Sequence, residues 1–162
     1  MKFETPQQRA AYEQVTEWMG KIVGSAEIEM GLKFFAHDDM PRFSMSYGTS
    51  VVRVDVLPYT WEYVDGHEND ALISMRAVVV KEADLTNECL LYLLRQNDTL
   101  SLGRFGVSGS NEIIFTHVMP ISLCENADEL ATFLAAVVKN ADEFDEQITQ
   151  QWGGRRATDI LV

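Results

Sequence analysis

A helix followed by two strands, within residues 84–119, constrains the fold of this chain more than any other stretch. Asp84 is expected to cap the helix, and residues 96–98, which include Asn97, are expected to end it. Residues 102–107 and 113–119 then have strand character and are separated by a polar turn. The helix carries one apolar stripe, formed by Leu85, Cys89, Leu90, Leu93 and Leu94. This unit predicts an antiparallel hairpin packed against a helix.

The glycines of the first predicted strand, Gly103 and Gly106, have two interpretations. Glycine in a strand often marks a place where another backbone or a helix packs closely. The same lack of a side chain could instead admit a ligand. In that second case Arg104, which lies between them, could hold an anion.

The N-terminal region begins with signals for a helix start. Thr5 can act as the N-cap, Pro6 suits the first helical position, and Gln8 completes a capping box. Gly24 is expected to end this helix. Apolar and polar residues alternate over 28–35, so that segment is expected to form a strand or an extended arm.

Three strands are expected between the first helix and the central unit. Residues 43–47 and 51–57 alternate, and the second strand can continue past Pro58 as far as residue 63. Proline cannot donate to a strand ladder, so Pro58 implies an edge or a bulge. A polar loop is expected at 65–70, followed by a valine-rich strand over 71–81.

An aromatic stripe follows Pro58. Tyr59, Trp61 and Tyr63 alternate and therefore share one face of the strand. These rings could pack under a helix, or they could dock a peptide or another subunit. Both interpretations are open at this point.

The last helix is the longest amphipathic stretch of the chain. Asn126 is a strong N-cap, Glu129 three residues later completes a pair resembling a capping box, and Gly153 ends the helix. Its apolar face comprises Leu130, Phe133, Leu134, Val137, Val138, Ala141, Phe144, Ile148 and Trp152. We expect one domain over residues 1–162, with a core from about 6 to 153 and a tail over 154–162.

Composition limits the classes of function. The formal net charge is −12, from 25 acidic and 13 basic residues, which opposes nucleic-acid binding. No run of about 18 apolar residues occurs, and the first residues lack an apolar segment. Nothing forces Cys89 and Cys124 to pair. We therefore expect a cytoplasmic protein that binds neither nucleic acid nor membrane.

Motifs for catalysis are missing from the sequence. There is no phosphate-binding glycine loop, no GxSxG elbow and no CxxC pair. His37, His67 and His117 are far apart and lack a metal-binding spacing. We therefore expect no enzyme activity, no catalytic residues, no metal and no cofactor.

The order of elements and several motifs resemble the YbjN family, above all its cyanobacterial members, and the related class I type III secretion chaperones. The resemblance rests on residues 90–98, 102–107, 113–117 and 141–145, and it covers about residues 7–154. It implies an α+β fold with an antiparallel sheet in the order α-βββ-α-ββ-α. It also implies a homodimer that holds an extended polypeptide client on an apolar surface.

Two hypotheses for function follow. The first is a non-enzymatic, chaperone-like or regulatory binding protein that contacts its partner through Tyr59, Trp61, Tyr63 and Arg104. The second is a small-molecule or anion-binding protein, or an enzyme, with a pocket between sheet and helices near Arg104 and His117.

Overall fold

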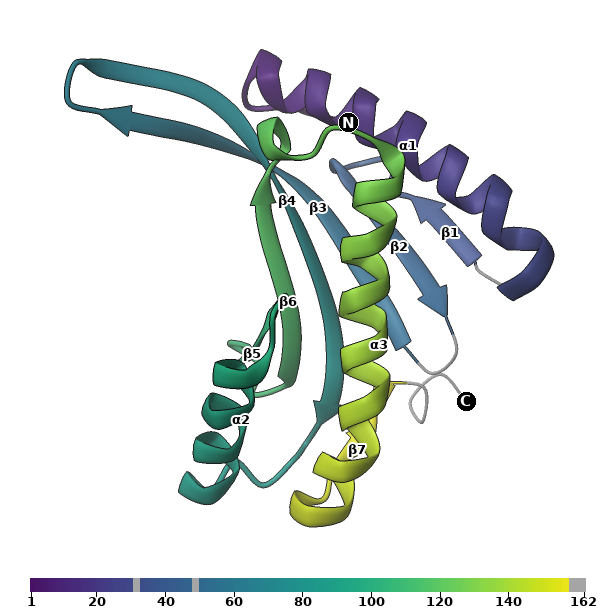
Figure 1. Cartoon of the computed structure of the whole chain (residues 1–162), viewed down its shortest axis with the longest axis vertical. Coiled ribbons are helices and arrows are strands. Elements are labelled where there is room, and N and C mark those ends of the chain that lie inside the picture. The colour runs from purple at the N-terminus through teal and green to yellow at the C-terminus, as the bar shows by residue number, and fades with distance from the viewer. Residues whose placement is uncertain (31–32, 48–49, 158–162) are drawn as a thin grey trace.

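An antiparallel sheet with three α-helices forms the fold in the computed structural model, which describes residues 1–30, 33–47 and 50–157 (Figure 1). The elements in chain order are α1 (Pro6–Met30), β1 (Lys33–Ala36), β2 (Arg42–Tyr47), β3 (Ser50–Tyr63), β4 (Gly66–Lys81), α2 (Asn87–Thr99), β5 (Arg104–Val107), β6 (Ile113–Pro120), the 3₁₀ helix η1 (Ile121–Leu123), α3 (Ala127–Trp152) and β7 (Arg155–Arg156).

The sheet has the strand order β1-β2-β3-β4-β6-β5, and each neighbouring pair is antiparallel. The expected α+β class with an antiparallel sheet is therefore confirmed. Two strands are added to the expected order. One is β1, within the segment left open between strand and arm. The other is β7, in which two residues of the expected tail pair with Val80 and Lys81 of β4.

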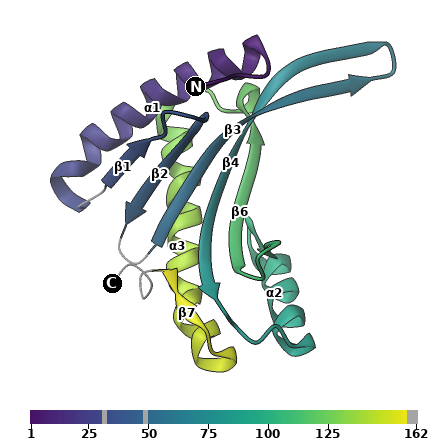
Figure 2. The same cartoon turned by 180° about the vertical axis from the view of Figure 1, so that it is seen from behind.

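Helices α1 and α3 cover one face of the sheet, and no helix of the described residues covers the other, as the view from behind shows (Figure 2). Side chains alternate along a strand, so each strand sends every second residue to the covered face. In β3 these are Val52, Val54 and Val56, and in β4 they include Ile73 and Met75, all fully buried. Leu130, Leu134 and Ile148 of α3, with Val15 and Met19 of α1, complete this core.

The start of α1 confirms the predicted cap, whereas its end was predicted wrongly. The backbone N–H of Gln8 donates to Thr5 Oγ1 at 3.1 Å. The helix continues through Gly24 to Met30. A glycine inside a helix costs only about 1 kcal/mol relative to alanine, which tertiary packing can offset. Helix therefore occupies residues 28–30 of the ambiguous segment, and residues 31–32 lie outside the described residues.

The polar loop expected at 65–70 is also wrong. β4 begins at Gly66 and pairs with β3 as far as Tyr63 opposite Gly66, so residues 64–65 alone connect the strands. Asp65-Gly66 is a turn signal that suits such a short connection, and Gly66 has φ +154°. The polar residues after Gly66 belong to β4, in a part of that strand that lies beyond the hydrophobic core.

The predicted helix caps have mixed outcomes. Asn126 caps α3, because Glu129 N–H donates to Asn126 Oδ1 at 3.0 Å, and α3 ends at Gly153 with φ +66°. Helix α2 starts after Thr86, whose Oγ1 accepts from Cys89 N at 3.2 Å, and not after Asp84. The backbone N–H of Asp84 is used elsewhere, since it donates to the carbonyl of Trp152 at 2.8 Å.

Candidate protein-binding surfaces

The outer half of the β3–β4 hairpin projects away from the body of the protein (Figures 1 and 2). We call residues 58–71 the arm. Pairing of β2 with β3 stops at Asp55, and pairing of β6 with β4 stops at Leu72. Within the described part of the chain, the arm strands are therefore paired with each other alone. Pro58 lies on the outer edge of β3 beyond the end of β2, where the absence of an N–H breaks no ladder.

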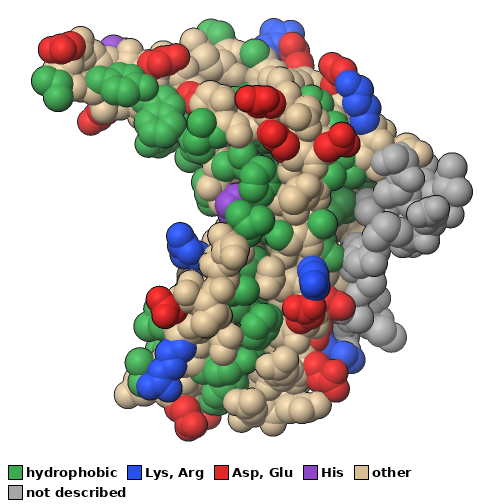
Figure 3. All heavy atoms as spheres, viewed as in Figure 1, with side chains coloured by type: hydrophobic (Ala, Val, Ile, Leu, Met, Phe, Trp, Pro, Cys, Tyr) green, Lys and Arg blue, Asp and Glu red, His purple; other side chains and the backbone are tan. Residues whose placement is uncertain are grey.

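The aromatic stripe lies on this arm and is not covered by a helix. Tyr59 and Trp61 make an edge-to-face contact with ring centroids 5.1 Å apart. Tyr63 is 58% exposed, and the adjacent Val64 at the tip is fully exposed. Figure 3 shows hydrophobic side chains along the arm, with acidic side chains beside them. The arm therefore presents an apolar surface to solvent.

Asp70 fixes the base of the arm. Its Oδ2 accepts hydrogen bonds from Trp61 Nε1 at 3.1 Å and from Ser122 Oγ at 2.6 Å. Its Oδ1 accepts from the N–H of Ala71 at 2.7 Å. Burial by itself would raise the pKa of the Asp70 carboxyl, but the hydrogen bonds from Ser122, Ala71 and Trp61 hold that pKa below its usual value. An ionised Asp70 thus ties the Trp61 indole and the arm to η1.

Arg104 and His117 do not line a common pocket between sheet and helices. His117 stacks on Phe133 of α3, with ring centroids 4.9 Å apart and an interplanar angle of 15°. Arg104 is paired with Thr116, the neighbour of His117, so the register places Arg104 on the helix-free face. Burial lowers the pKa of His117, and the charge of Arg104 lowers it further. His117 is therefore a neutral packing residue at pH 7.

Gly103 supports the close-packing interpretation. It has φ +74°, and a Cβ placed there would lie 2.4 Å from the ring of Phe115 and 3.1 Å from the carbonyl of Thr116. The position has no room for a side chain. Gly106 differs, because a Cβ there would meet Ile114 at an ordinary 3.6 Å.

A second exposed apolar surface lies on α2 and β5. Leu91 and Leu94 of α2 are 50% and 64% exposed, and Val107 of β5 is also exposed. The side chain of Asn97 joins these two elements. Its Nδ2 donates to the carbonyl of Phe105 at 3.1 Å, and its Oδ1 accepts from the N–H of Phe105 at 2.6 Å. Helix α2 ends at Thr99, one residue beyond the expected stop at 96–98, and the Asn97 amide serves the neighbouring strand.

The described residues contain no group of three or more His, Cys, Asp or Glu side chains that could hold a metal ion. His37 instead hydrogen bonds to Ser44 Oγ at 2.9 Å. Cys89 and Cys124 are buried thiols that do not form a disulfide, and burial raises the pKa of both. Within the same residues, no helix is long and apolar enough to cross a membrane.

Known protein structures resemble this fold at low sequence identity. A chain in the HopA1–SchA chaperone–effector complex matches with a TM-score of 0.59 and 12% identity, over 85% of this chain and 97% of that chain. A chain in the ExsC–ExsE complex matches with a TM-score of 0.55 and 13% identity, over 85% and 95%. The Yersinia pestis type III secretion chaperone SycH, in complex with a stable fragment of YscM2, matches with a TM-score of 0.52 and 14% identity, over 82% and 98%.

These matches define the class of fold. No protein-family model and no curated protein sequence matches the chain. The chain has an α+β fold like that of type III secretion chaperones. The resemblance to the YbjN family stays a prediction.

Proposed function

We propose that this protein is a non-enzymatic, chaperone-like binding protein that holds an extended polypeptide on the arm. The arm carries the proposal, because it combines two half-buried rings, Tyr59 and Trp61, and the exposed ring of Tyr63 with strand edges that no described residue pairs. An extended peptide can add to such an edge through main-chain hydrogen bonds, while pockets between side chains give selectivity. Tyr59, Trp61 and Tyr63 supply rigid rings at low entropic cost, which suits binding hot spots.

The similar structures support the same proposal. One is a chaperone–effector complex, and another is a chaperone with a fragment of a second protein. In this chain, the Trp61 indole is held by Asp70 before any partner arrives. Such preorganisation reduces the entropic cost of binding.

We further propose that the protein acts as a cytoplasmic homodimer, as a single YbjN-like domain per chain. The surface formed by Leu91, Leu94 and Val107 is the candidate interface, since apolar patches of this kind on a soluble protein mark protein contacts. Replacing Leu91 and Leu94 with Glu should convert a dimer to a monomer in light scattering coupled to gel filtration. A wild-type protein that is monomeric at high concentration would contradict this part.

Shortening the arm tests the polypeptide-binding proposal. Tyr59 lies opposite Asp70, so an Asn-Gly turn can join these two residues in place of 60–69. The probe is fluorescently labelled α-lactalbumin, kept unfolded by reduction and carboxymethylation, and binding is followed by anisotropy. We expect wild type to bind the unfolded probe and the shortened protein to bind at least about tenfold more weakly.

Two further samples make the test specific. Leu123→Ala removes an exposed apolar side chain outside the arm and should leave binding unchanged. Native α-lactalbumin should not bind to wild type. Equal binding of the unfolded probe by wild type and the shortened protein would exclude the arm as the contact surface.

A further inference from the structure

A row of arginines crosses the helix-free face of the sheet. The strand registers place one residue of each strand in line, and the row runs Phe35, Ser44, Arg53, Arg76, Thr116 and Arg104 from β1 to β5. Arg53 and Arg76 are direct cross-strand neighbours. Like charges in directly opposed positions destabilise a sheet. The Arg53–Asp55 ion pair offsets part of this repulsion, and the guanidinium of Arg76 has no such carboxylate beside it among the described residues.

The local charge is opposite to that of the whole chain. The cations Arg42, Arg53, Arg76, Lys81 and Arg104 lie on or beside this face, in a chain of net charge −12. Asp55 is shared, because it pairs with Arg42 and also with Arg53 at 2.8 Å. Lys81 pairs with Glu112 at 3.1 Å. Among the residues that the structure describes, the guanidinium of Arg76 has no ion-pair or hydrogen-bond partner, although its backbone pairs within the sheet.

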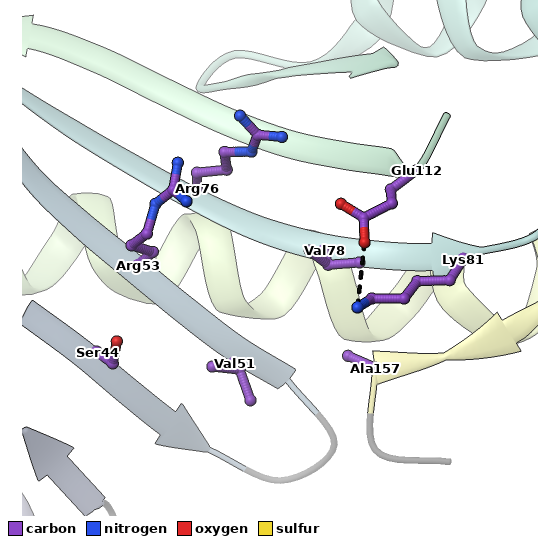
Figure 4. Close-up of a pocket in the computed structure, with 8 residues that line it drawn as sticks. All are labelled: Ser44, Val51, Arg53, Arg76, Val78, Lys81, Glu112 and Ala157. Atoms are coloured by element: carbon purple, nitrogen blue, oxygen red, sulfur yellow. Dashed lines mark ion pairs between the residues drawn. The ribbon is translucent and has the colours of Figure 1, made fainter. Parts of the chain in front are cut away.

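The row borders a hollow of about 310 Å³, shown in Figure 4. Val51 and Val78 contribute apolar lining, and Ser44 lies at one side. Arg53 and Arg76 lie together near one end of the hollow, and the Lys81–Glu112 pair lies toward the other. The hollow therefore offers an apolar contact next to two adjacent guanidinium groups.

We propose that the row of Arg53, Arg76 and Arg104 binds an acidic, extended segment of the polypeptide client. This inference rests on the proposed function and specifies that the bound segment of the client is negatively charged. Adjacent strands are about 4.8 Å apart, so the row from Arg53 on β3 to Arg104 on β5 spans about 14 Å. An extended peptide places the side chains of residues i and i+4 about 13 Å apart, on one face. Guanidinium groups bind carboxylates through paired, charge-assisted hydrogen bonds.

Three ligands could occupy the row: a phosphate, a second copy of this chain, or an acidic segment of another protein. A single phosphate fills one position, whereas the row offers arginines over a length of several residues. The proposed dimer contact uses Leu91, Leu94 and Val107 and does not need the arginine row, so the row is left to a different partner. An acidic segment of another protein fits both the spacing and the sign of charge.

The test uses a short fluorescein-labelled peptide in which Glu alternates with Ser, and a matched peptide with Gln in place of Glu. We expect the Glu peptide to bind and the Gln peptide not to bind, and binding to weaken as salt is raised. Arg76→Gln and Arg104→Gln should each weaken binding about tenfold or more. Arg104 is exposed, so its variant keeps the test valid if Arg76→Gln does not fold. Lys139→Gln, an exposed charge change on α3, should have no effect.

Three binding outcomes and one change of oligomeric state would overturn the inference. The binding outcomes are equal binding of the Gln peptide, unchanged binding by Arg104→Gln, and binding of inorganic phosphate alone without the Glu peptide. A change of oligomeric state in Arg104→Gln without a change in peptide affinity would also overturn it, in favour of a second copy. The arm-shortened protein separates the two proposals. It should still bind the Glu peptide, so loss of the unfolded client with retention of this peptide implicates the arm alone.

Discussion

The two halves of the β3–β4 hairpin have the same backbone pairing and opposite surroundings. In the inner half, Val54 and Val56 face Met75 and Ile73, and α1 and α3 cover them. In the outer half, Tyr63 faces Gly66, and the arm extends beyond the helices (Figure 1). One continuous ladder therefore supports a hydrophobic core at one end and an exposed surface at the other.

This difference shows what stabilises each half. A two-stranded ribbon without a third strand or a covering helix is marginal in water. The arm is therefore expected to depend on the inner half for its order and on Asp70 for its attachment. A surface held in this way can adapt to a partner without disturbing the core.

The largest expected effect contrasts buried and exposed residues of this one hairpin. Ile73→Ala should lower the free energy of unfolding by about 2–5 kcal/mol, since it leaves a cavity in the core. Tyr63→Ala should change it by less than about 0.5 kcal/mol, because the ring is exposed. Urea denaturation measures both values. Similar losses in the two variants would mean that the arm belongs to the cooperative core.

The next effect extends the contrast to the covered and helix-free faces. Gly103→Ala should cost about 2 kcal/mol or more, since it forces a side chain into positive φ and against the buried ring of Phe115. Gly106→Ala meets Ile114 at an ordinary distance and should be tolerated within about 0.5 kcal/mol. Thermal unfolding of the pair distinguishes the positions. A stable Gly103→Ala protein would show that Phe115 can move aside.

At the boundary between the halves, Asp70→Asn should lower the free energy of local unfolding of the arm by about 1–3 kcal/mol. Asparagine keeps one acceptor oxygen and places a donor NH₂ in the other position, so it cannot accept all three hydrogen bonds that the carboxylate receives from Trp61, Ser122 and Ala71. Hydrogen exchange should accelerate at residues 58–71 and remain slow in the inner half. Equal acceleration in both halves would contradict a local role for Asp70.

Asp70 also predicts a dependence on pH. Its folded-state pKa is lowered, so its stabilisation is complete above the unfolded value of about 3.9 and is lost as the pH falls through the lower folded value. Exchange in the arm of wild type should therefore accelerate in strong acid. The Asp70→Asn protein should lack this added acceleration.

The smallest effect concerns His117. Its folded pKa lies below 6.5, so the unfolded state binds more protons between these two values, and stability rises with pH across that window. His117→Gln should flatten this slope. Arg104→Gln should raise the pKa of His117 in an NMR titration, whereas Arg95→Gln on α2 should not. An unchanged pKa in Arg104→Gln would show that burial alone accounts for the shift.

The sequence was most informative where structure is decided locally. The N-cap at Asn126, the apolar stripe of α3 and the strand character of residues 113–119 depend on near neighbours in the chain, and the structure confirms them. The strand at 66–70 was missed, because its polar residues read as a loop and pairing with β3 decides their conformation. Asp84 was a suitable cap by type, yet its N–H is engaged by the end of α3.

The candidate surfaces were predictable to different degrees. Alternation alone placed Tyr59, Trp61 and Tyr63 on one face, but their exposure depends on where the helices stop covering the sheet. Arg53, Arg76 and Arg104 are far apart in the sequence and become neighbours through three separate strand registers. Without these registers, no signal in the sequence connects them.

The bond pair between Asn97 and Phe105 has a consequence for assembly. β5 is the edge strand on that side of the sheet, and Asn97 occupies both main-chain groups of Phe105. A foreign strand cannot join the sheet there without displacing this side chain. Endless fibres of stacked sheets need two compatible edges on each molecule. Asn97 blocks the β5 edge, whereas the strand edges of the arm can still pair with a partner. This combination favours finite complexes over filaments.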